Sequence, residues 1–175
     1  LAGGGTIPCC AGFGVNATGG FLQYDTPDQI RAYTQEPPYE SVPVMPNIGM
    51  SLSTVVGDAA MHALSSDHQV LAAFAEACVS TSVQHNLTGL VMDYEPGSNP
   101  ANVTAAQYAG VVRFITLRMH AEGKQFGLFL AGWGILGDWS AYKDTGADLF
   151  ATMDYYPTGN LPGTAAKVDS ILAAG

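Results

Sequence analysis

The sequence is poor in charge, and above all in positive charge. Of its 175 residues 12% are charged, with 15 acidic and 6 basic side chains and a net charge of −9. A chain this acidic is repelled by phosphate backbones and anionic membrane surfaces, which excludes nucleic acid as an expected partner. No apolar run reaches the roughly 18 residues of a membrane-spanning helix, because Gly, Pro, Asp or His interrupts each one. With 47% hydrophobic residues, we expect a globular chain with a core and no membrane insertion.

Cysteine and histidine are also scarce, which limits disulfides and metal sites. Cys9, Cys10 and Cys78 are an odd number of cysteines without the spacing of metal ligands. In an oxidising compartment they would form one disulfide, of open pairing, and one free thiol, whereas the alternative for Cys78 is a small core residue of a helix. The four histidines share no common face and have no neighbouring ligands. We therefore predict no metal site.

Three N-glycosylation sequons are present, and each falls where we expect a turn or a helix boundary. They begin at Asn16, Asn86 and Asn102, and each has Thr two residues later. Three sequons in a chain with few lysines favour secretion. We therefore predict a secreted, extracellular glycoprotein with glycans on these three asparagines.

Hydrophobic periodicity and turn residues divide most of the chain into alternating strands and helices. Capping boxes at 26–29 and 104–107 mark the starts of two helices, and Ser65 or Ser66 is available to cap a third. Residues 1–20 are rich in glycine and predict a loop or a peripheral strand. Strands are predicted at 21–24, 42–49, 87–95, 126–131 and 147–155, and helices from 27, over 67–84, from 105 to about 122, over 138–145 and over 164–174.

This order of elements predicts a parallel sheet with right-handed crossovers, in one domain over 1–175. About five strands are visible, whereas a closed (β/α)8 barrel takes about 250 residues. The chain is therefore either part of a barrel or a smaller open sheet. We favour a TIM-barrel-like α/β fold of which the chain contains only a part, about from strand 2 or 3 to helix 6.

The segment 88–96 carries the strongest functional signal. Along a strand, Val91, Asp93 and Glu95 share one face, while Leu90, Met92 and Tyr94 share the other. An apolar strand with acids only at its carboxyl end is typical of barrel active sites. A carboxyl group at an apolar rim can keep its proton near neutral pH, which is what a general acid requires.

These residues resemble the family 18 glycoside hydrolases, whose fourth barrel strand carries Asp-Gly-x-Asp-x-Asp-x-Glu. In the aligned segment Gly89, Asp93 and Glu95 match, while Thr88 and Val91 replace the first two acids. The tetrapeptide 153–156 is similar to the Met-x-Tyr-Asp of the family's sixth strand, with Tyr at its last position, and the Ile-Gly at 48–49 is similar to part of the family's Ser-x-Gly-Gly.

The resemblance implies retaining, substrate-assisted hydrolysis of N-acetylglucosamine-containing glycans of chitin or N-glycan type, with no metal and no organic cofactor. It implies that Glu95 protonates the leaving oxygen, that Asp93 orients and charge-stabilises the N-acetyl group, and that Tyr155 hydrogen-bonds the carbonyl of that group. The substrate-binding candidates are Trp133, Tyr156, Met153 and Tyr94, although Trp133 could instead be a packing residue at the rim.

The two replaced acids leave an alternative open. Val91 stands where the family has a second Asp beneath Asp93, so the pair that would share a proton is missing. We therefore expect Asp93 to stay ionised and turnover to be weak. The alternative to an enzyme is a non-catalytic extracellular glycoprotein of the same fold. It would bind carbohydrate or form a structural unit that self-assembles.

Overall fold

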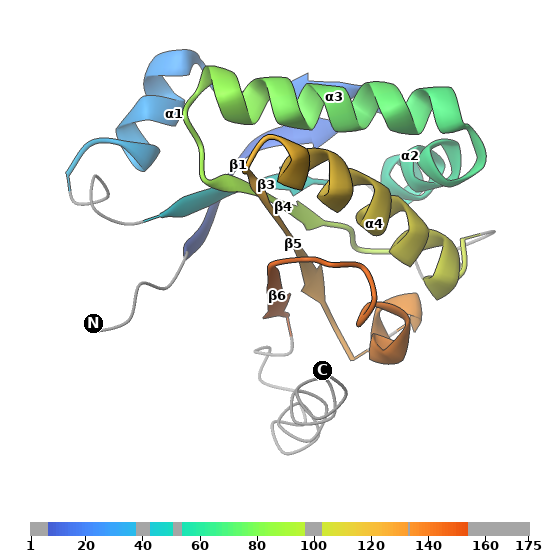
Figure 1. The fold of residues 1–175 in the computed structure, drawn as a ribbon. Helices are drawn as coiled ribbons and strands as arrows, with labels where there is room; N and C mark the ends of the chain where they lie inside the picture. The colour runs from blue at the N-terminus through green and yellow to red at the C-terminus, as the bar shows by residue number, and fades with distance from the viewer. Residues whose placement is uncertain (1–6, 38–42, 51–53, 97–102, 133, 154–175) are drawn as a thin grey trace.

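The computed structural model describes residues 7–37, 43–50, 54–96, 103–132 and 134–153. They form a six-stranded sheet in the order β2-β1-β3-β4-β5-β6, in which β2 pairs antiparallel with β1 and all other pairs are parallel (Figure 1). The strands are β1 (Ile7–Val15), β2 (Phe21–Gln23), β3 (Val44–Gly49), β4 (Gly89–Asp93), β5 (Gln125–Leu130) and β6 (Leu149–Thr152). The described sheet is open, with β2 and β6 at its edges, as expected for part of a barrel.

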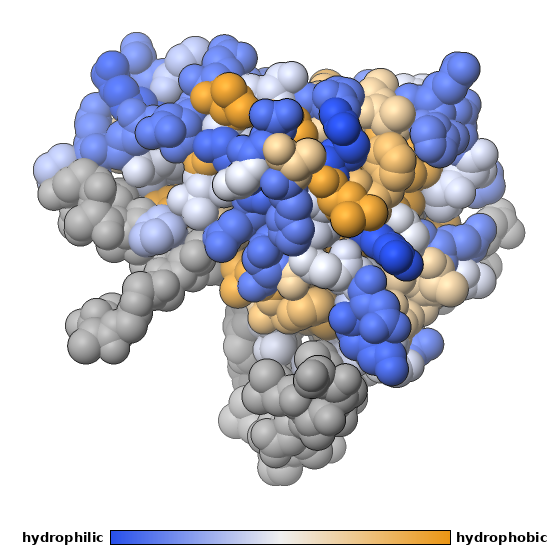
Figure 2. Space-filling view, viewed as in Figure 1, coloured by the Kyte–Doolittle hydropathy of each residue, from blue (hydrophilic) through white to orange (hydrophobic). Residues whose placement is uncertain are grey.

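Within the described residues, four α-helices and two short 3-10 helices connect the strands, and α3 and α4 lie together along one side of the sheet (Figure 1). The helices are α1 (Pro27–Thr34), α2 (Thr54–Ser66), α3 (His68–Gln84) and α4 (Ala105–Ala121), and the 3-10 helices are η1 (Gly134–Gly137) and η2 (Trp139–Ala141). Seen from this side, the surface is largely hydrophilic, with hydrophobic patches over α3 and α4 (Figure 2). None of the described helices is long and apolar enough to cross a membrane.

The predicted helix starts are confirmed where the sequence carries a capping box. Thr26 and Gln29 cap α1 reciprocally, and Thr104 and Gln107 do the same for α4. The cap of α3 was predicted wrongly. Asp67 is the residue whose side chain accepts from the first backbone N–H groups of α3, because the two serines considered for this role belong to the end of α2.

Three other features differ from the sequence prediction. Of the two alternatives for residues 1–20, the structure has a strand over 7–15, but it lies inside the sheet between β2 and β3. The β1–β2 hairpin breaks the strict strand–helix alternation, because a five-residue turn lets β2 fold straight back onto β1. Helix α2 was not predicted, and the helix expected over 138–145 is replaced by η2 and a turn.

The predicted alternation of β4 is confirmed. Leu90, Met92 and Tyr94 are fully buried in the main hydrophobic core, which lies between the sheet and the helices. Val91 is also fully buried but lies outside this core, on the opposite face with Asp93. Asp93 therefore belongs to the face that would line the interior of a closed barrel, and Glu95 follows two residues after β4 ends.

Cys78 fits the core alternative. Its thiol is free and fully buried on α3, and burial raises its pKa far above the ordinary value of a thiol. The side chains of Cys9 and Cys10 lie outside the described residues, so one disulfide of open pairing stays a prediction.

Candidate active site at the carboxyl end of the sheet

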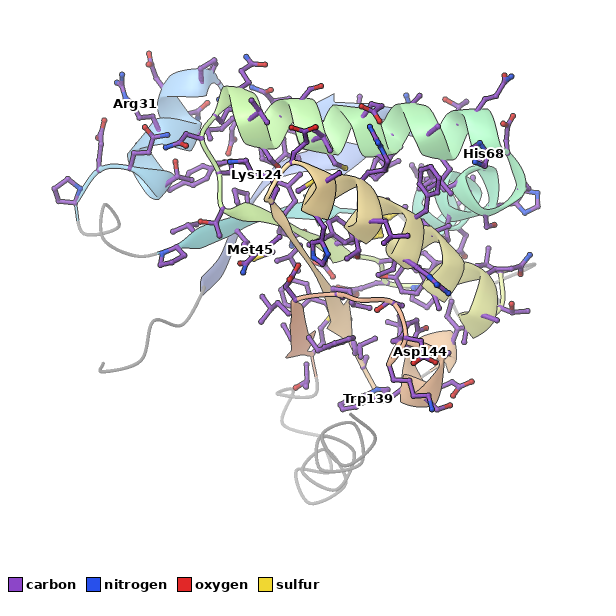
Figure 3. The ribbon with its side chains drawn as sticks, in the orientation of Figure 1. Arg31, Met45, His68, Lys124, Trp139 and Asp144 are labelled. Atoms are coloured by element: carbon purple, nitrogen blue, oxygen red, sulfur yellow. The ribbon has the colours of Figure 1, made fainter. Side chains whose placement is uncertain are left out.

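The candidate site is built where β3 and β4 end side by side. Asn47 and Val91 are register partners, and so are Gly49 and Asp93. Across this pair of strands, Asn47 Nδ2 donates a hydrogen bond of 2.9 Å to Asp93 Oδ2. Met45, on the side of β3 away from α3 in Figure 3, shares its strand face with Asn47. The amide and the carboxylate therefore face the barrel interior together.

Burial shapes the protonation of both acids. The pKa of Asp93 is raised by its burial, and the hydrogen bond from Asn47 opposes part of this rise because it favours the carboxylate. The pKa of Glu95 is also raised, first by burial and then by the negative charge of Asp93. The direction of this shift is the one that a general acid requires. The raised pKa of Asp93 runs against the expectation that this residue stays fully ionised.

Beside Asp93, the described residues leave an open space over the backbone of Gly49. Of the described atoms, a β-carbon on Gly49 would touch only the carbonyl oxygen of Phe13, at 3.8 Å. One strand further, the ring of Tyr24 covers the Cα of Gly14, which is the register partner of Gly49. Since neighbouring strands are about 4.8 Å apart, the backbones of Gly14 and Asp93 are separated by roughly 10 Å. Tyr24, which is 47% exposed, and Asp93 thus flank the space over Gly49.

Comparison with known proteins finds relatives by structure and not by sequence. No family model and no curated protein matches the sequence. Solved structures do match, among them a class V chitinase from Pseudomonas fluorescens Pf-5, with a TM-score of 0.66 and 18% identity over 86% of this chain. A GH18 chitinase from Flavobacterium johnsoniae matches with a TM-score of 0.65 and 13% identity over 86% of this chain. A Group IV chitinase from Ostrinia furnacalis in complex with allosamidin matches with 0.65 and 14% over 85%.

The described part of the chain has the fold of the family 18 chitinases. It spans about half the length of these structures, 46% of the first, 53% of the second and 42% of the third. This confirms the prediction of a partial TIM-barrel-like fold. It also agrees with the resemblance to family 18 drawn from the sequence.

Within this chitinase fold, Tyr94 does not line the site, which corrects its prediction as a substrate-binding residue. Its side chain is fully buried on the helix side of β4, where its hydroxyl donates to Asp58 Oδ1 of α2 at 2.8 Å. Its ring packs edge-on against Tyr108 of α4 with centroids 5.3 Å apart. Tyr94 stands between the two acids in the chain. Its contacts with α2 and α4 therefore fix the end of β4 from the helix side of the sheet.

Loss of the Tyr94 hydroxyl should therefore weaken the fold without exposing the site. We expect Tyr94→Phe to lower the free energy of unfolding by about 1–3 kcal/mol, because Asp58 loses a donor that its carboxylate accepts from. Urea denaturation measures this difference. A matched control is Tyr24→Phe, which removes a hydroxyl from an exposed tyrosine and should change the free energy by less than about 0.5 kcal/mol. Equal losses in the two variants would contradict this prediction.

Met153 is likewise poorly placed to contact a substrate. It is 4% exposed and belongs to the hydrophobic core, and its backbone N–H donates to the carbonyl of Leu130. The structure therefore corrects its prediction as a substrate-binding residue. The other candidates Tyr155, Tyr156 and Trp133 lie outside the described residues, as does the sequon asparagine Asn102.

The two described sequon asparagines lie in turns, as predicted. Asn16 sits in the β1–β2 turn, where its Oδ1 accepts from the backbone and hydroxyl of Thr18 and from the backbone of Gly20. Asn86 is exposed between α3 and β4 with a φ of 51°. Glycosylation of both stays a prediction. Among the described residues, no three His, Cys, Asp or Glu side chains gather as metal ligands would.

Sequence reasoning missed two residues of this site. Asn47 had no predicted role, and Tyr24 was predicted only as the last residue of a short strand. The signal for Asn47 was its place two residues before the end of β3, on the same face as Gly49. Tyr24 gave no such signal, because its position over Gly14 depends on the β1–β2 hairpin.

Proposed function

We propose that the chain is the catalytic part of a glycoside hydrolase that acts on N-acetylglucosamine-containing glycans. The observation that carries the proposal is the pair Asp93 and Glu95 at the carboxyl end of β4, each with a raised pKa, in a sheet with the chitinase fold. The Ostrinia furnacalis chitinase binds allosamidin in its solved structure, which supports a carbohydrate ligand for this fold. We propose no metal and no cofactor.

The proposed reaction is substrate-assisted hydrolysis with retention of configuration. Glu95 donates its proton to the glycosidic oxygen, so the bond between this oxygen and the anomeric carbon breaks without expelling an alkoxide. The acetamido oxygen of the same sugar attacks the anomeric carbon. Asp93 accepts a hydrogen bond from the acetamido N–H and stabilises the positive charge that develops on this group. Water then opens this intermediate after giving a proton back to Glu95, which restores the starting state.

A second candidate function is carbohydrate binding without hydrolysis, in a lectin or a self-assembling extracellular glycoprotein. The observation that favours it is the fully buried Val91, which stands where the family pattern has an acid. In this candidate function, a sugar binds in the open space beside Tyr24 and Asp93, and Glu95 takes no part in a chemical step. Secretion and glycosylation at Asn16, Asn86 and Asn102 are proposed for both candidates.

The two candidates differ in whether a bond is cleaved. We expect the chain to release short oligosaccharides from hexa-N-acetylchitohexaose, with the new reducing ends first appearing as the β-anomer. Mass spectrometry detects the products, and proton NMR in the first minutes identifies the anomer. Binding without any product at high protein concentration would leave only the second candidate, and a first-formed α-anomer would contradict retention.

Tyr24 provides a test of where the sugar binds. Sugar rings stack on exposed aromatic faces, and Tyr24 offers such a face beside the open space over Gly49. We expect Tyr24→Ala to weaken chitooligosaccharide binding by about tenfold, a loss typical of one aromatic contact of about 1.4 kcal/mol. Isothermal titration calorimetry measures the affinity. Tyr24→Phe keeps the ring and should bind like the parent, so equal losses in both variants would exclude stacking.

A further inference from the structure

Asp93 has a hydrogen-bonding neighbour on the adjacent strand in place of one on its own strand. Val91, two residues before Asp93, is fully buried and aliphatic, so it can neither donate nor accept. Its register partner on β3 is Asn47, whose Nδ2 donates to Asp93 Oδ2 at 2.9 Å. The amide of Asn47 thus reaches the carboxylate from the side where strand pairing brings β3 and β4 together.

This bond leaves the two oxygens of Asp93 unequal. Oδ2 is taken up by Asn47, whereas Oδ1 is buried and has no hydrogen-bond partner among the described residues. A buried carboxylate oxygen without a donor is costly, so Oδ1 is the acceptor of Asp93 that is left for a ligand. To reach it, the ligand has to displace the atoms that cover this oxygen. The bond also fixes which way the Asn47 amide points, because a carboxylate accepts and only the NH₂ end donates.

We propose that Asn47 is a positioning residue that holds Asp93 by Oδ2 and thereby presents Oδ1 to an N–H donor of the ligand. This inference rests on the proposed function, in which that donor is the acetamido N–H of N-acetylglucosamine. Asn47 itself touches Asp93 and acts through it. The departure at Val91 is then compensated from β3 by a neutral group that holds the carboxylate and cannot take its proton.

The neutrality of Asn47 has a consequence that can be measured. Two carboxyl groups in hydrogen-bond contact share one proton, and the second proton is lost only at a raised pH, whereas an amide leaves Asp93 to titrate without such a partner. The ionisable side chains that interact with Asp93 in the described residues are Glu95 and Tyr108 of α4. The residues of β3 and β5 on the same face carry no ionisable group.

Removal of the amide tests the bond directly and does not need activity. In Asn47→Ala, Asp93 loses a donor that favours its ionised form, so its pKa should rise above that of the parent. The measurement is a pH titration of the Asp93 carboxyl carbon by NMR in the ligand-free chain. Binding of tri-N-acetylchitotriose should also weaken by about tenfold or more, since a hydrogen bond to a charged group is lost.

Asn47→Asp provides the rescue that a merely structural asparagine would not show. At about pH 5 the new pair of acids retains one proton, which restores an O–H donor to Asp93, so triose binding should be within about twofold of the parent. At about pH 8 both acids lose their protons and repel, so binding should fall by about tenfold or more. The matched control is Asn86→Asp, the same change at an exposed turn before β4, which should bind like the parent at both pH values.

The outcomes separate this inference from the proposed function. A parent chain that cleaves no chitooligosaccharide removes the proposed hydrolysis, while the titration of Asp93 in the parent and in Asn47→Ala still decides the role of Asn47. Identical Asp93 titrations in these two proteins would overturn the inference. If Asn47→Ala does not fold, Asn47→Asp decides instead, and equal triose affinity at the two pH values in this variant would overturn the inference as well.

Discussion

Glu95→Gln is expected to abolish hydrolysis of chitooligosaccharides and to leave their binding nearly unchanged. Glutamine keeps the size and polarity of the side chain but has no carboxyl proton for the leaving oxygen. General acid catalysis is worth about 10²–10⁴-fold, and a loss of this size follows if Glu95 is the acid. Initial rates on hexa-N-acetylchitohexaose measure the loss, and calorimetry with the same sugar measures the binding.

The pH profile of the parent sharpens this prediction. Glu95 must be protonated, so kcat/KM should fall as the pH rises through the pKa of Glu95, which burial and the charge of Asp93 both raise. Asp93 must be ionised, so kcat/KM should also fall as the pH drops through its pKa, which burial raises. The active form is therefore the state in which Asp93 and Glu95 together hold one proton. The plot of kcat/KM against pH should be bell-shaped, and its two apparent pKa values belong to the pair and not to either residue alone.

A control acid lies at the other end of the sheet. Glu122 is exposed just after α4, and Glu122→Gln makes the same chemical change away from β4, so its activity should match that of the parent. A Glu95→Gln variant that keeps more than about a tenth of the parent rate would remove Glu95 as the general acid, since even the weakest general acids contribute about 10². Loss of binding together with activity would point to a structural role of Glu95.

The sequence predicts best those features that depend on neighbours along the chain. The face of Asp93 follows from the two-residue period of a strand, and the starts of α1 and α4 follow from capping boxes that are complete within four residues. Such signals need no tertiary contact to be read. The position of the acids at the carboxyl end of β4 was predictable for the same reason.

Features that depend on contacts distant in the sequence were missed. Near its start, helix α2 has two valines and Gly57, which are weak helix formers. Its place is set by packing against α3 and α4 and by the close approach of Gly57 to Met50. The hydroxyl of Tyr94 reaches Asp58 across 36 positions, and the amide of Asn47 reaches Asp93 across 46. The period of β4 placed Tyr94 on the core face but could not identify its partner.

The close approach of α2 to Met50 predicts a second large effect on stability, at Gly57. A β-carbon on Gly57 would overlap the backbone carbonyl oxygen of Met50, which cannot move aside as a flexible side chain would. The N–H of Met50 donates to the carbonyl oxygen of Asp93 at 2.9 Å, so displacement of Met50 also disturbs β4. We expect Gly57→Ala to cost about 1–3 kcal/mol, as overpacking of a core does, even though alanine favours a helix.

Gly110 of α4 is the matched control, because a β-carbon there would meet none of the described atoms within 4 Å. Gly110→Ala should stabilise the chain by about 0.5–1 kcal/mol, which is the intrinsic preference of a helix for alanine over glycine. The two variants make the same substitution in two helices, so their melting temperatures should move in opposite directions, by roughly 2–4 °C per kcal/mol. If both variants stabilise the chain, the prediction that a β-carbon on Gly57 overlaps the carbonyl oxygen of Met50 is wrong. The support that this contact gives to the end of β4 then has to come from Tyr94 and Asp58.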